Sequence, residues 1–359
     1  MNKKIIFTTG GSGGHIFPAI NLMKYFSKKG YKILLVTDKR GKNFINNYSS
    51  HRSIIINTSS PTNKNYFKKI ISYIIIFFAI LKSFFLIIKE KPNLIFGLGG
   101  YVSFPISFAS KFFKVPLIIY ENNMTLGRAN KKLLPIAKKI ILTFKTPINL
   151  NKRYYDKIFY SGNILSEDII NYSIKEKNID NKFFSILILG GSQGAEIFGR
   201  IIPPAIKMIK DKGYEIKIFQ QCILSQKNSI IEFYNSNLIK NNIFIFSNNI
   251  LNLMTSCDLA ISRSGASTTA ELTKTLTPFV AVPLPQSIDN HQYLNANYYK
   301  EKGCCWIIEQ NNFTTINLFN FLMDILKNKK KLIDIKLNMK KNDNGNSYNK
   351  IETLIEGLI

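Results

Sequence analysis

The stretch Thr8-Thr9-Gly10-Gly11-Ser12-Gly13-Gly14-His15-Ile16-Phe17-Pro18 decides how the rest of the chain is interpreted. The apolar run Ile5-Ile6-Phe7 precedes it, which predicts a buried strand, a loop whose backbone can approach a ligand closely, and a helix start. Pro18 suits a first helical turn, where its missing N–H would have no partner. Free N–H groups and the helix dipole attract anions there, and His15 at the rim can change its charge near neutral pH. We therefore place the candidate chemistry at this stretch.

Composition sets the class of protein. A length of 359 residues favours two domains, and an apolar fraction of 45% is enough for sizeable cores. The formal net charge of +27 indicates attraction to an anionic partner, namely nucleic acid, an acidic membrane surface or phosphorylated substrates. AT-rich coding, which favours lysine, isoleucine and asparagine, is an equal explanation. Because no aromatic-basic signature accompanies the charge, we do not predict nucleic-acid binding.

The cysteines and the N-terminus give two further expectations. Cys222, Cys257, Cys304 and Cys305 show no metal-ligand spacing and no neighbouring histidine, so we expect no disulfide framework and a reducing cytoplasm. The chain starts directly in a strand, without the pattern of a signal peptide.

Apolar runs alternate with helical stretches through the first half of the chain. The first helix is predicted from about Phe17 to a stop at Gly30. Continuous apolar strands separated by helices predict a parallel sheet covered on both faces. The predicted strands are Ile5–Thr9, Ile33–Thr37, Leu94–Gly97, Leu117–Tyr120, Ile140–Thr143 and Ile158–Tyr160.

The pattern then repeats. After a polar stretch that ends at Lys182, Phe183–Leu189 leads into Gly190–Ala195 and a helix, as in the opening unit. Two doubly wound, Rossmann-like parallel-sheet domains of the α/β class are predicted, with a ligand held in the cleft between them. The domain boundaries are 1–161, 162–340 and a closing helix in 341–359 that crosses back to the first domain. Further strands are predicted at Ile216–Phe219, Ile243–Phe246, Leu259–Ser262, Phe279–Val282 and Cys304–Ile308.

The stretch Ile70–Ile88 contains a single charge, Lys82, and nearly reaches the length of a membrane span. Spanning would place the first strands and Leu94 onward on opposite sides of a bilayer, which a single sheet does not permit. We expect a helix packed on the sheet whose outer face dips into the lipid interface, and a fully buried helix is the alternative. The lysines that would meet anionic head groups are Lys64, Lys68, Lys69, Lys82, Lys89 and Lys91.

The second domain contains a further anion-binding pattern at Ser262–Leu272. Small and hydroxylated residues at a helix start leave N–H groups open to a diphosphate, and Arg263 adds positive charge. Glu271, about one turn into the helix, suits the two hydroxyls of a ribose. A capped helix whose first turn merely contains an acid is the alternative.

Three polar loops follow other strands. Pro283–Gln292 carries amide and imidazole groups that can bind sugar hydroxyls, although a polar loop with a helix cap at Asp289 explains it equally well. Gly97–Ser103 is a third glycine loop. Glu121-Asn122-Asn123 places polar groups at the end of the strand Leu117–Tyr120.

Two motifs point elsewhere and are rejected. Gly10–Gly14 and Gly190–Gly194 fit the G-x-S-x-G elbow of serine hydrolases, and Ser192, Asp258 and His291 fall in triad order. One motif present twice, beside a second anion-binding helix start, suits phosphate binding better. The sequence has no dinucleotide fingerprint, no G-x-x-x-x-G-K-[ST] loop and no metal-ligand cluster, so we predict no cofactor and no metal. Helix ends and basic groups must then stabilise a leaving diphosphate.

Four motifs together resemble the MurG family of N-acetylglucosaminyltransferases: Gly10–Ala19, Gly97–Pro105, Gly190–Ala195 and Ser262–Leu272. They occur in order over about residues 3–310. The resemblance implies a GT-B fold, UDP-N-acetylglucosamine as donor and undecaprenyl-pyrophosphoryl-MurNAc-pentapeptide as acceptor, converting lipid I to lipid II in peptidoglycan synthesis. It also implies inversion at the anomeric carbon and a peripheral position on the cytoplasmic face of the bacterial inner membrane.

The resemblance also assigns roles to residues. His15 is the candidate general base for the 4-hydroxyl of the acceptor, and Tyr101 and Glu121 lie on the acceptor side. Ser166 stands where the family commonly has an arginine, so that contact is not carried over. The residues expected to bind UDP-N-acetylglucosamine are Ser12, Gly13, Gly14, Asn123, Ser192, Ser247, Arg263, Ala266, Ser267, Thr268, Thr269, Glu271 and Gln292.

Two other functions remain open from the sequence. One is a GT-B glycosyltransferase with a different lipid or small-molecule acceptor. The other is a nucleotide-sugar-binding protein without catalysis.

Overall fold

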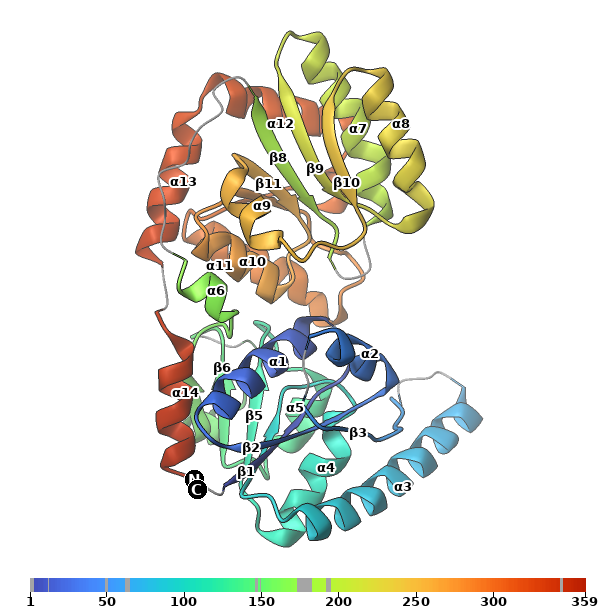
Figure 1. Cartoon of the computed structure of the whole chain (residues 1–359), viewed down its shortest axis with the longest axis vertical. Coiled ribbons are helices and arrows are strands. Elements are labelled where there is room, and N and C mark those ends of the chain that lie inside the picture. Colours follow the sequence, from blue (N-terminus) through green and yellow to red (C-terminus); the bar gives the residue numbers. More distant parts are fainter. Residues whose placement is uncertain are drawn as a thin grey trace. The chain divides into compact units, whose positions relative to one another are not determined.

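The computed structural model describes residues 3–11, 13–48, 51–61, 65–145, 148, 150–172, 183–191, 195–342 and 345–359. The chain divides into two compact units (Figure 1). The first unit comprises Met1–Ser166 and Asn344–Ile359, and the second unit comprises Glu167–Asp343. Each unit has its own parallel sheet, as the alternation of apolar runs and helices predicts.

The sheet of the first unit has seven strands in the order β3-β2-β1-β4-β5-β6-β7, and every neighbouring pair is parallel. The chain runs outward to one edge from β1 and then returns to start the other half at β4. Ligands of doubly wound sheets bind beyond the carboxyl ends of the strands at this switch point. The strands are β1 (Lys4–Thr8), β2 (Lys32–Thr37), β3 (Ser53–Ile55), β4 (Leu94–Gly97), β5 (Leu117–Glu121), β6 (Lys139–Leu142) and β7 (Ile158–Tyr160).

Successive strand residues point to opposite faces of this sheet, so its continuous apolar strands make both faces apolar, and helices cover both. Ile6 of β1 lies in the core beneath three helices, whereas the neighbouring Phe7 packs against Phe26 of the first helix. The three helices over the Ile6 face are α3 (Tyr66–Glu90), α4 (Ser103–Ser110) and α5 (Arg128–Leu133), and the other early helices are α1 (Gly13–Lys28) and α2 (Lys39–Tyr48).

The last helix, α14 (Ser347–Glu356), belongs to the first unit although the second unit separates the two in sequence. The Tyr348 ring stacks on Tyr25 of α1 at 4.7 Å, and the Tyr25 hydroxyl bonds Glu352 at 2.6 Å. The Ser347 hydroxyl donates to the carbonyl of Asn163 at 2.9 Å. These contacts fix the C-terminal segment on the first unit.

The second unit repeats the arrangement with six parallel strands in the order β10-β9-β8-β11-β12-β13. Its switch point lies between β8 and β11. The strands are β8 (Phe184–Leu189), β9 (Ile216–Gln221), β10 (Lys240–Phe244), β11 (Leu259–Ser262), β12 (Phe279–Ala281) and β13 (Trp306–Ile307). The helices are α6 (Glu167–Ile170), α7 (Glu196–Asp211), α8 (Lys227–Ser236), α9 (Ile250–Ser256), α10 (Ala266–Lys274), α11 (His291–Glu301), α12 (Thr315–Lys327) and α13 (Lys330–Lys341).

Three strands differ from the sequence prediction. β3 was not predicted, because its three half-buried edge residues are too few to show a pattern. β10 spans Lys240–Phe244 and not Ile243–Phe246, since the apolar residues at the end of the run lie beyond the paired segment. β13 covers only Trp306–Ile307 of the predicted Cys304–Ile308. The remaining strands lie within one or two residues of their predicted positions.

Candidate active site

At the switch point of the first unit, the loop after β1 packs against the loop after β4. The N–H of Leu98 donates to the carbonyl of Thr8 at 2.8 Å, and the N–H of Gly10 donates to the carbonyl of Gly99 at 3.2 Å. Gly99 and Gly100 have positive φ angles of 92° and 79°, which glycine adopts without strain. The first and third predicted glycine loops therefore form one structure.

The imidazole of His15 lies against this structure. A Cβ on Gly99 would come within 3.0 Å of His15 Cε1, and a Cβ on Gly100 within 3.0 Å of Gly10 Cα. A Cβ at position 99 would require the ring to shift by a few tenths of an ångström, at a φ that favours glycine. The half-buried His15 is thus positioned by a loop some eighty residues later in the sequence.

The helix α1 begins at Gly13, so the prediction that it begins near Phe17 with Pro18 in its first turn is wrong. Pro18 lies inside the helix and has no N–H to donate to the carbonyl of Gly14 four residues earlier. Asn122 Nδ2 donates to that carbonyl instead, at 3.1 Å. The Asn122 amide oxygen in turn accepts from the buried Tyr120 hydroxyl at 2.9 Å. The end of β5 is thereby tied to the start of α1, beside His15.

Glu121, predicted on the acceptor side, is only 1% exposed. Its carboxylate accepts from the N–H of Gly127 at 2.8 Å, from Asn130 Nδ2 at 2.9 Å, and from the N–H and Nδ2 of Asn123 at 3.2 and 3.3 Å. Burial raises the pKa of Glu121 despite these bonds. The Glu121 carboxylate therefore orders the loop that carries Asn123, and we do not propose that it touches substrate.

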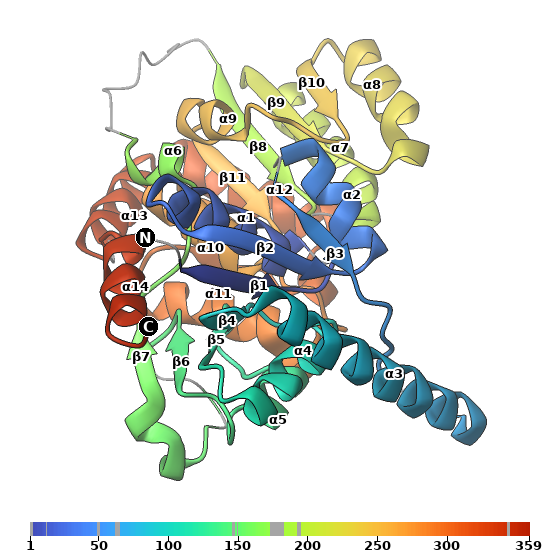
Figure 2. The ribbon, with the colours of Figure 1, turned by 60° about the horizontal axis from the view of Figure 1, so that its bottom comes forward.

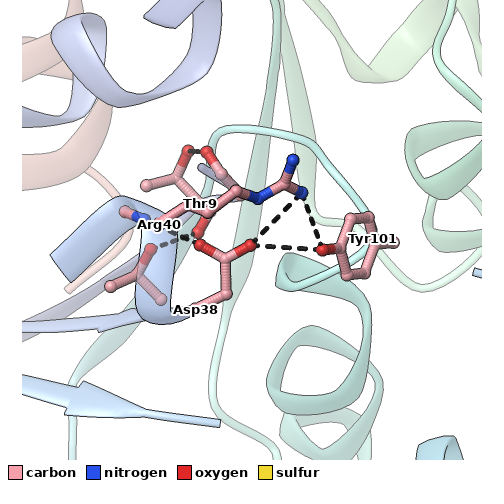
Figure 3. Close-up of polar contacts among 7 residues, drawn as sticks. Thr9, Asp38, Arg40 and Tyr101 are labelled. Carbon is pink, nitrogen blue, oxygen red and sulfur yellow. Dashed lines mark hydrogen bonds and ion pairs between the residues drawn. The ribbon is translucent and has the colours of Figure 1, made fainter. Parts of the chain in front are cut away.

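Tyr101, the other residue predicted on the acceptor side, follows Gly100 directly. Its hydroxyl accepts from Arg40 Nη2 at 3.0 Å and donates to Asp38 Oδ2 at 3.2 Å (Figure 3). Sequence reasoning missed Arg40 and Asp38, because nothing in the segment after β2 marks them as neighbours of the third glycine loop.

In the second unit, Arg263 follows β11 and was predicted to bind the diphosphate. The structure corrects this prediction. The side chain is 8% exposed, Nη1 donates to the carbonyls of Val282 and Pro283 at 3.0 and 3.2 Å, and Nη2 donates to Gln310 Oε1 at 2.6 Å. The guanidinium also packs over the Phe198 ring at 5.1 Å. Arg263 therefore joins the carboxyl ends of strands and does not reach outward.

We expect Arg263→Ala to destabilise the second unit by about 2 to 4 kcal/mol, because buried acceptors lose their donor. Differential scanning calorimetry should show the midpoint falling by about 10 °C. Arg200→Ala, at an exposed position on α7, is the matched control and should leave the midpoint unchanged. A fully stable Arg263→Ala protein with weakened UDP binding would restore the original assignment.

The helix α10 begins after Gly265 without a side-chain cap, at the switch point between β8 and β11. Ser267 and Thr268 lie half-buried in its first turn. Thr269, in contrast, donates its N–H to the carbonyl of Gly265 at 3.0 Å, and its buried hydroxyl bonds backbone carbonyls of the same turn. The predicted diphosphate contact therefore narrows from Ala266–Thr269 to the start of the helix, without Thr269.

Glu271 is half-buried, and no hydrogen bond or ion pair of its carboxylate occurs among the described residues. Burial raises its pKa to about 7. The buried hydroxyls of Ser262 and Ser264, at the end of β11, also find no partner in the described part of the chain. Buried polar groups without a protein partner, at the switch point of a sheet, are suited to bind a polar ligand.

The loop after β12 places Gln292 in the first turn of α11. Gln292 Oε1 accepts from the N–H of Leu284 at 3.0 Å, which leaves its amide N–H groups as donors. Asn295, one turn later and fully buried, donates to the carbonyl of Ser264 at 3.3 Å. Sequence reasoning missed Asn295, although its spacing of three residues from Gln292 places both on one helix face. Ser247 lies after β10, where its hydroxyl accepts from the N–H of Asn249.

Two of the residues predicted to bind UDP-N-acetylglucosamine, Ser12 and Ser192, lie outside the described residues. Gly13 and Gly14 form the first residues of α1, next to His15. Within the described ranges, His, Cys, Asp and Glu side chains form no group of three that could hold a metal ion. The cleft predicted between the domains stays a prediction.

Comparison with known proteins assigns both halves of the chain. The model of the glycosyltransferase family 28 N-terminal domain matches residues 5–142, and that of the family 28 C-terminal domain matches residues 185–355. A Pelagibacter ubique protein is 34% identical over 359 residues, which covers 100% of this chain and 99% of the relative. A Rickettsia canadensis protein is 36% identical over 360 residues, covering 99% of this chain and 100% of the relative. Both carry the name UDP-N-acetylglucosamine--N-acetylmuramyl-(pentapeptide) pyrophosphoryl-undecaprenol N-acetylglucosamine transferase.

The fold is shared with a solved structure as well. The crystal structure of Acinetobacter baumannii MurG superposes with a TM-score of 0.78 at 23% identity, over 99% of each chain. This likeness supports the two-sheet α/β architecture that the sequence predicts.

Proposed function

The chain belongs to glycosyltransferase family 28, in the MurG family of its full-length relatives, and from this we propose which reaction it catalyses. It transfers N-acetylglucosamine from UDP-N-acetylglucosamine to the 4-hydroxyl of the muramyl sugar in undecaprenyl-pyrophosphoryl-MurNAc-pentapeptide. The first unit binds the acceptor, and the second unit binds the sugar nucleotide.

The observation that carries this proposal is the Glu271 carboxylate. It lies about one turn inside a helix that starts without a side-chain cap, and it is partly desolvated without a protein partner in the described ranges. A diphosphate at the helix start benefits from the dipole and the backbone N–H groups. A ribose beside that diphosphate would then donate both hydroxyls to Glu271. A nucleoside diphosphate satisfies the two features together, and the family resemblance identifies it as UDP.

The proposed chemical step uses a residue of the first unit and a helix start of the second unit. His15 accepts the proton of the acceptor hydroxyl as that oxygen attacks the anomeric carbon of the donor. The bond from the anomeric carbon to the diphosphate breaks, and UDP leaves with the electron pair. The start of α10 stabilises the negative charge that develops on the diphosphate.

The structure excludes the hydrolase alternative for the triad Ser192, Asp258 and His291. Asp258 precedes β11, and its Oδ2 accepts from the N–H and hydroxyl of Ser185 at 2.8 and 2.7 Å, at the amino end of the sheet. His291 follows β12, at the carboxyl end of the parallel strands, and its Nδ1 lies 2.8 Å from the carbonyl of Ile288. Asp258 and His291 therefore stand at opposite edges of one sheet.

The test of the proposed reaction measures UDP release from UDP-N-acetylglucosamine with and without a lipid-linked muramyl acceptor. We expect UDP release to depend on the acceptor, with one UDP formed for each lipid glycosylated. Release at the same rate without acceptor indicates hydrolysis. Tight UDP binding without release under either condition indicates a non-catalytic binding protein.

We further propose that α3 binds the lipid interface, as expected for the helix at Ile70–Ile88, and that it does so on the cytoplasmic face of the membrane, as the family resemblance implies. In the described part of the chain, α3 is the one helix long and apolar enough to cross a bilayer, yet 28% of its most apolar window is buried. Its first half projects from the first unit in both views (Figures 1 and 2). The exposed apolar side chains are Tyr66, Phe67, Ile70, Ile71, Tyr73, Ile74, Phe77, Phe78, Leu81, Phe85 and Ile88.

A membrane span conflicts with the sheet. β1 and β4 are neighbours in register, with Ile6 opposite Ile95, and α3 lies between them in sequence. A spanning α3 would separate these paired strands across the bilayer. We propose that the helix lies in the interface and that Lys68, Lys69, Lys82, Lys89 and Lys91 meet anionic head groups. Lys64, which was predicted with them, lies outside the described residues.

Replacing Ile74, Phe77 and Phe78 together by Ser should weaken binding to vesicles of phosphatidylglycerol by about 100-fold, because three half-exposed apolar side chains no longer enter the lipid. Vesicle co-sedimentation measures the loss. The matched control replaces Ile316, Ile333 and Leu337, equally exposed on the second unit, and should bind like the unmodified protein. Equal loss in both variants would show that α3 is not the membrane contact.

A further inference from the structure

A polar cluster at the carboxyl end of β2 is not used by the reaction described so far. It consists of Asp38, Arg40 and Tyr101, from the segment after β2 and from the loop after β4 (Figure 3). Arg40 Nη2 donates to the Tyr101 hydroxyl at 3.0 Å and lies 3.7 Å from Asp38 Oδ2. The Tyr101 hydroxyl donates to the same Asp38 oxygen at 3.2 Å. The guanidinium is therefore held in one place by two groups.

The cluster is built against the first glycine loop. A Cβ on Gly11 would come within 2.6 Å of both Arg40 Cβ and Asp38 Oδ1, and within 2.8 Å of the N–H nitrogen of Gly41. Asp38 Oδ1 also accepts from that N–H at 2.8 Å. Only glycine at position 11 permits this approach, so the Arg40 backbone has a fixed position beside the loop that leads to His15.

The guanidinium itself faces solvent. The Arg40 side chain is 65% exposed, and only its Nη2 has a hydrogen-bond partner among the described residues. An ion pair this exposed contributes little to the stability of a fold. A planar guanidinium with most donors unused suits a phosphate or a carboxylate, which it can bind through two parallel hydrogen bonds.

The position of the cluster indicates which substrate supplies that anion. Tyr101 is the residue after Gly100, and Gly99 and Gly100 are the residues that hold His15 and the first glycine loop. The Arg40 cluster and the His15 imidazole therefore contact consecutive residues of the same loop in the first unit, Tyr101 and Gly99–Gly100 respectively. The uncapped helix start and Glu271 belong to the second unit, which we assign to the donor.

We infer that Arg40, held by Tyr101 and Asp38, binds an anionic group of the acceptor and so selects acceptors that carry one beside the reacting sugar. This inference rests on the proposed function. Two groups of the proposed acceptor have the required chemistry, the diphosphate that links sugar to lipid and the carboxylates of the peptide. Asp38 and Tyr101 act as positioning residues for the guanidinium.

The test compares Arg40→Gln with Lys39→Gln. Lys39 is the exposed neighbour in the same helical turn, so the control removes the same charge without touching the cluster. With a muramyl-pentapeptide diphosphate on a short prenyl chain as substrate, Arg40→Gln should raise the acceptor KM about 10- to 100-fold. The KM for UDP-N-acetylglucosamine and the Tm should stay unchanged. Arg40→Lys should restore part of the loss, and Tyr101→Phe should show a smaller rise.

Three results separate the possible outcomes. If Arg40→Gln and Lys39→Gln behave alike, or if the donor KM rises with the acceptor KM, the inference is overturned while the transferase stands. If the unmodified protein makes no glycosylated lipid, the proposed function fails, and calorimetric titration of the same acceptor still tests Arg40. An acceptor with amidated peptide carboxylates identifies the source: a persisting Arg40→Gln effect indicates the diphosphate, and a vanished effect indicates a carboxylate.

Discussion

The protein with His15→Ala should transfer sugar about 10²- to 10⁴-fold more slowly than the unmodified protein, with unchanged affinity for UDP. General base catalysis by one positioned side chain contributes this much to a rate. UDP affinity should persist because His15 belongs to the first unit, whereas the nucleotide is assigned to the second. Single-turnover rates measure the chemical step, and isothermal titration measures UDP binding. Near-normal turnover in a folded His15→Ala protein would remove the assignment of His15 as base.

Gly99→Ala tests the position of the imidazole, because this variant keeps His15 but displaces its ring. The added Cβ would come within 3.0 Å of His15 Cε1 and 3.1 Å of Nδ1, at a backbone φ of 92° that favours glycine. We expect this variant to lose turnover as well, since the ring must shift by a few tenths of an ångström from the position that a general base requires. Gly30→Ala is the matched comparison, because Gly30 also has a positive φ but its Cβ would meet nothing within 4 Å. It should lose stability alone.

The second large effect concerns Glu271→Gln. At pH 8, UDP should bind about 10- to 100-fold more weakly, because two ribose hydroxyls lose an ionised acceptor. The free protein should nevertheless become more stable. Burial raises the folded-state pKa of Glu271 to about 7, so its contribution to stability falls as the pH rises from about 4.5 to 7. Removing that charge should stabilise the free protein at pH 8 by about 2 to 3 kcal/mol, and should change nothing below pH 4.

The same shift makes UDP binding pH-dependent. Hydrogen bonds to the ionised carboxylate lower its pKa, so nucleotide binding should release a proton between pH 6 and 7. For UDP-N-acetylglucosamine, which has no terminal phosphate to titrate here, affinity of the unmodified protein should therefore rise with pH through this range, while that of Glu271→Gln should stay flat. Glu301→Gln, at an exposed acid of α11, is the control for net charge. Unchanged UDP affinity in Glu271→Gln would place the ribose elsewhere.

Much of the fold was predictable because buried parallel strands are long apolar runs. Ile5–Thr9 and Phe183–Leu189 show this pattern, and the strands that they form, β1 and β8, each border the switch point of their sheet. Local signals failed where tertiary contacts decide. Pro18 looks like a helix start, yet Asn122, about a hundred residues later, takes over the carbonyl that Pro18 leaves unpaired.

The sequence predicts which residue types form the candidate site better than it predicts which way their side chains point. Glu271 and Gln292 lie where helix starts after parallel strands place them. Arg263 has the right charge at the right loop, but the sequence does not show that carbonyls of the next strand and Gln310 surround it. Arg40, in contrast, was not predicted at all, because its partner Tyr101 lies on a loop that only the fold brings close.

The proposed reaction is transfer of the sugar to a lipid-linked hydroxyl that His15 activates. The direct measurement incubates the protein with UDP-N-acetylglucosamine labelled in the sugar and with the undecaprenyl-linked muramyl-pentapeptide, then determines the linkage in the extracted lipid by NMR. We expect the label to enter the lipid through the 4-hydroxyl, with inverted configuration at the anomeric carbon. Label recovered as free N-acetylglucosamine, or bound to the lipid with retained configuration, would contradict it.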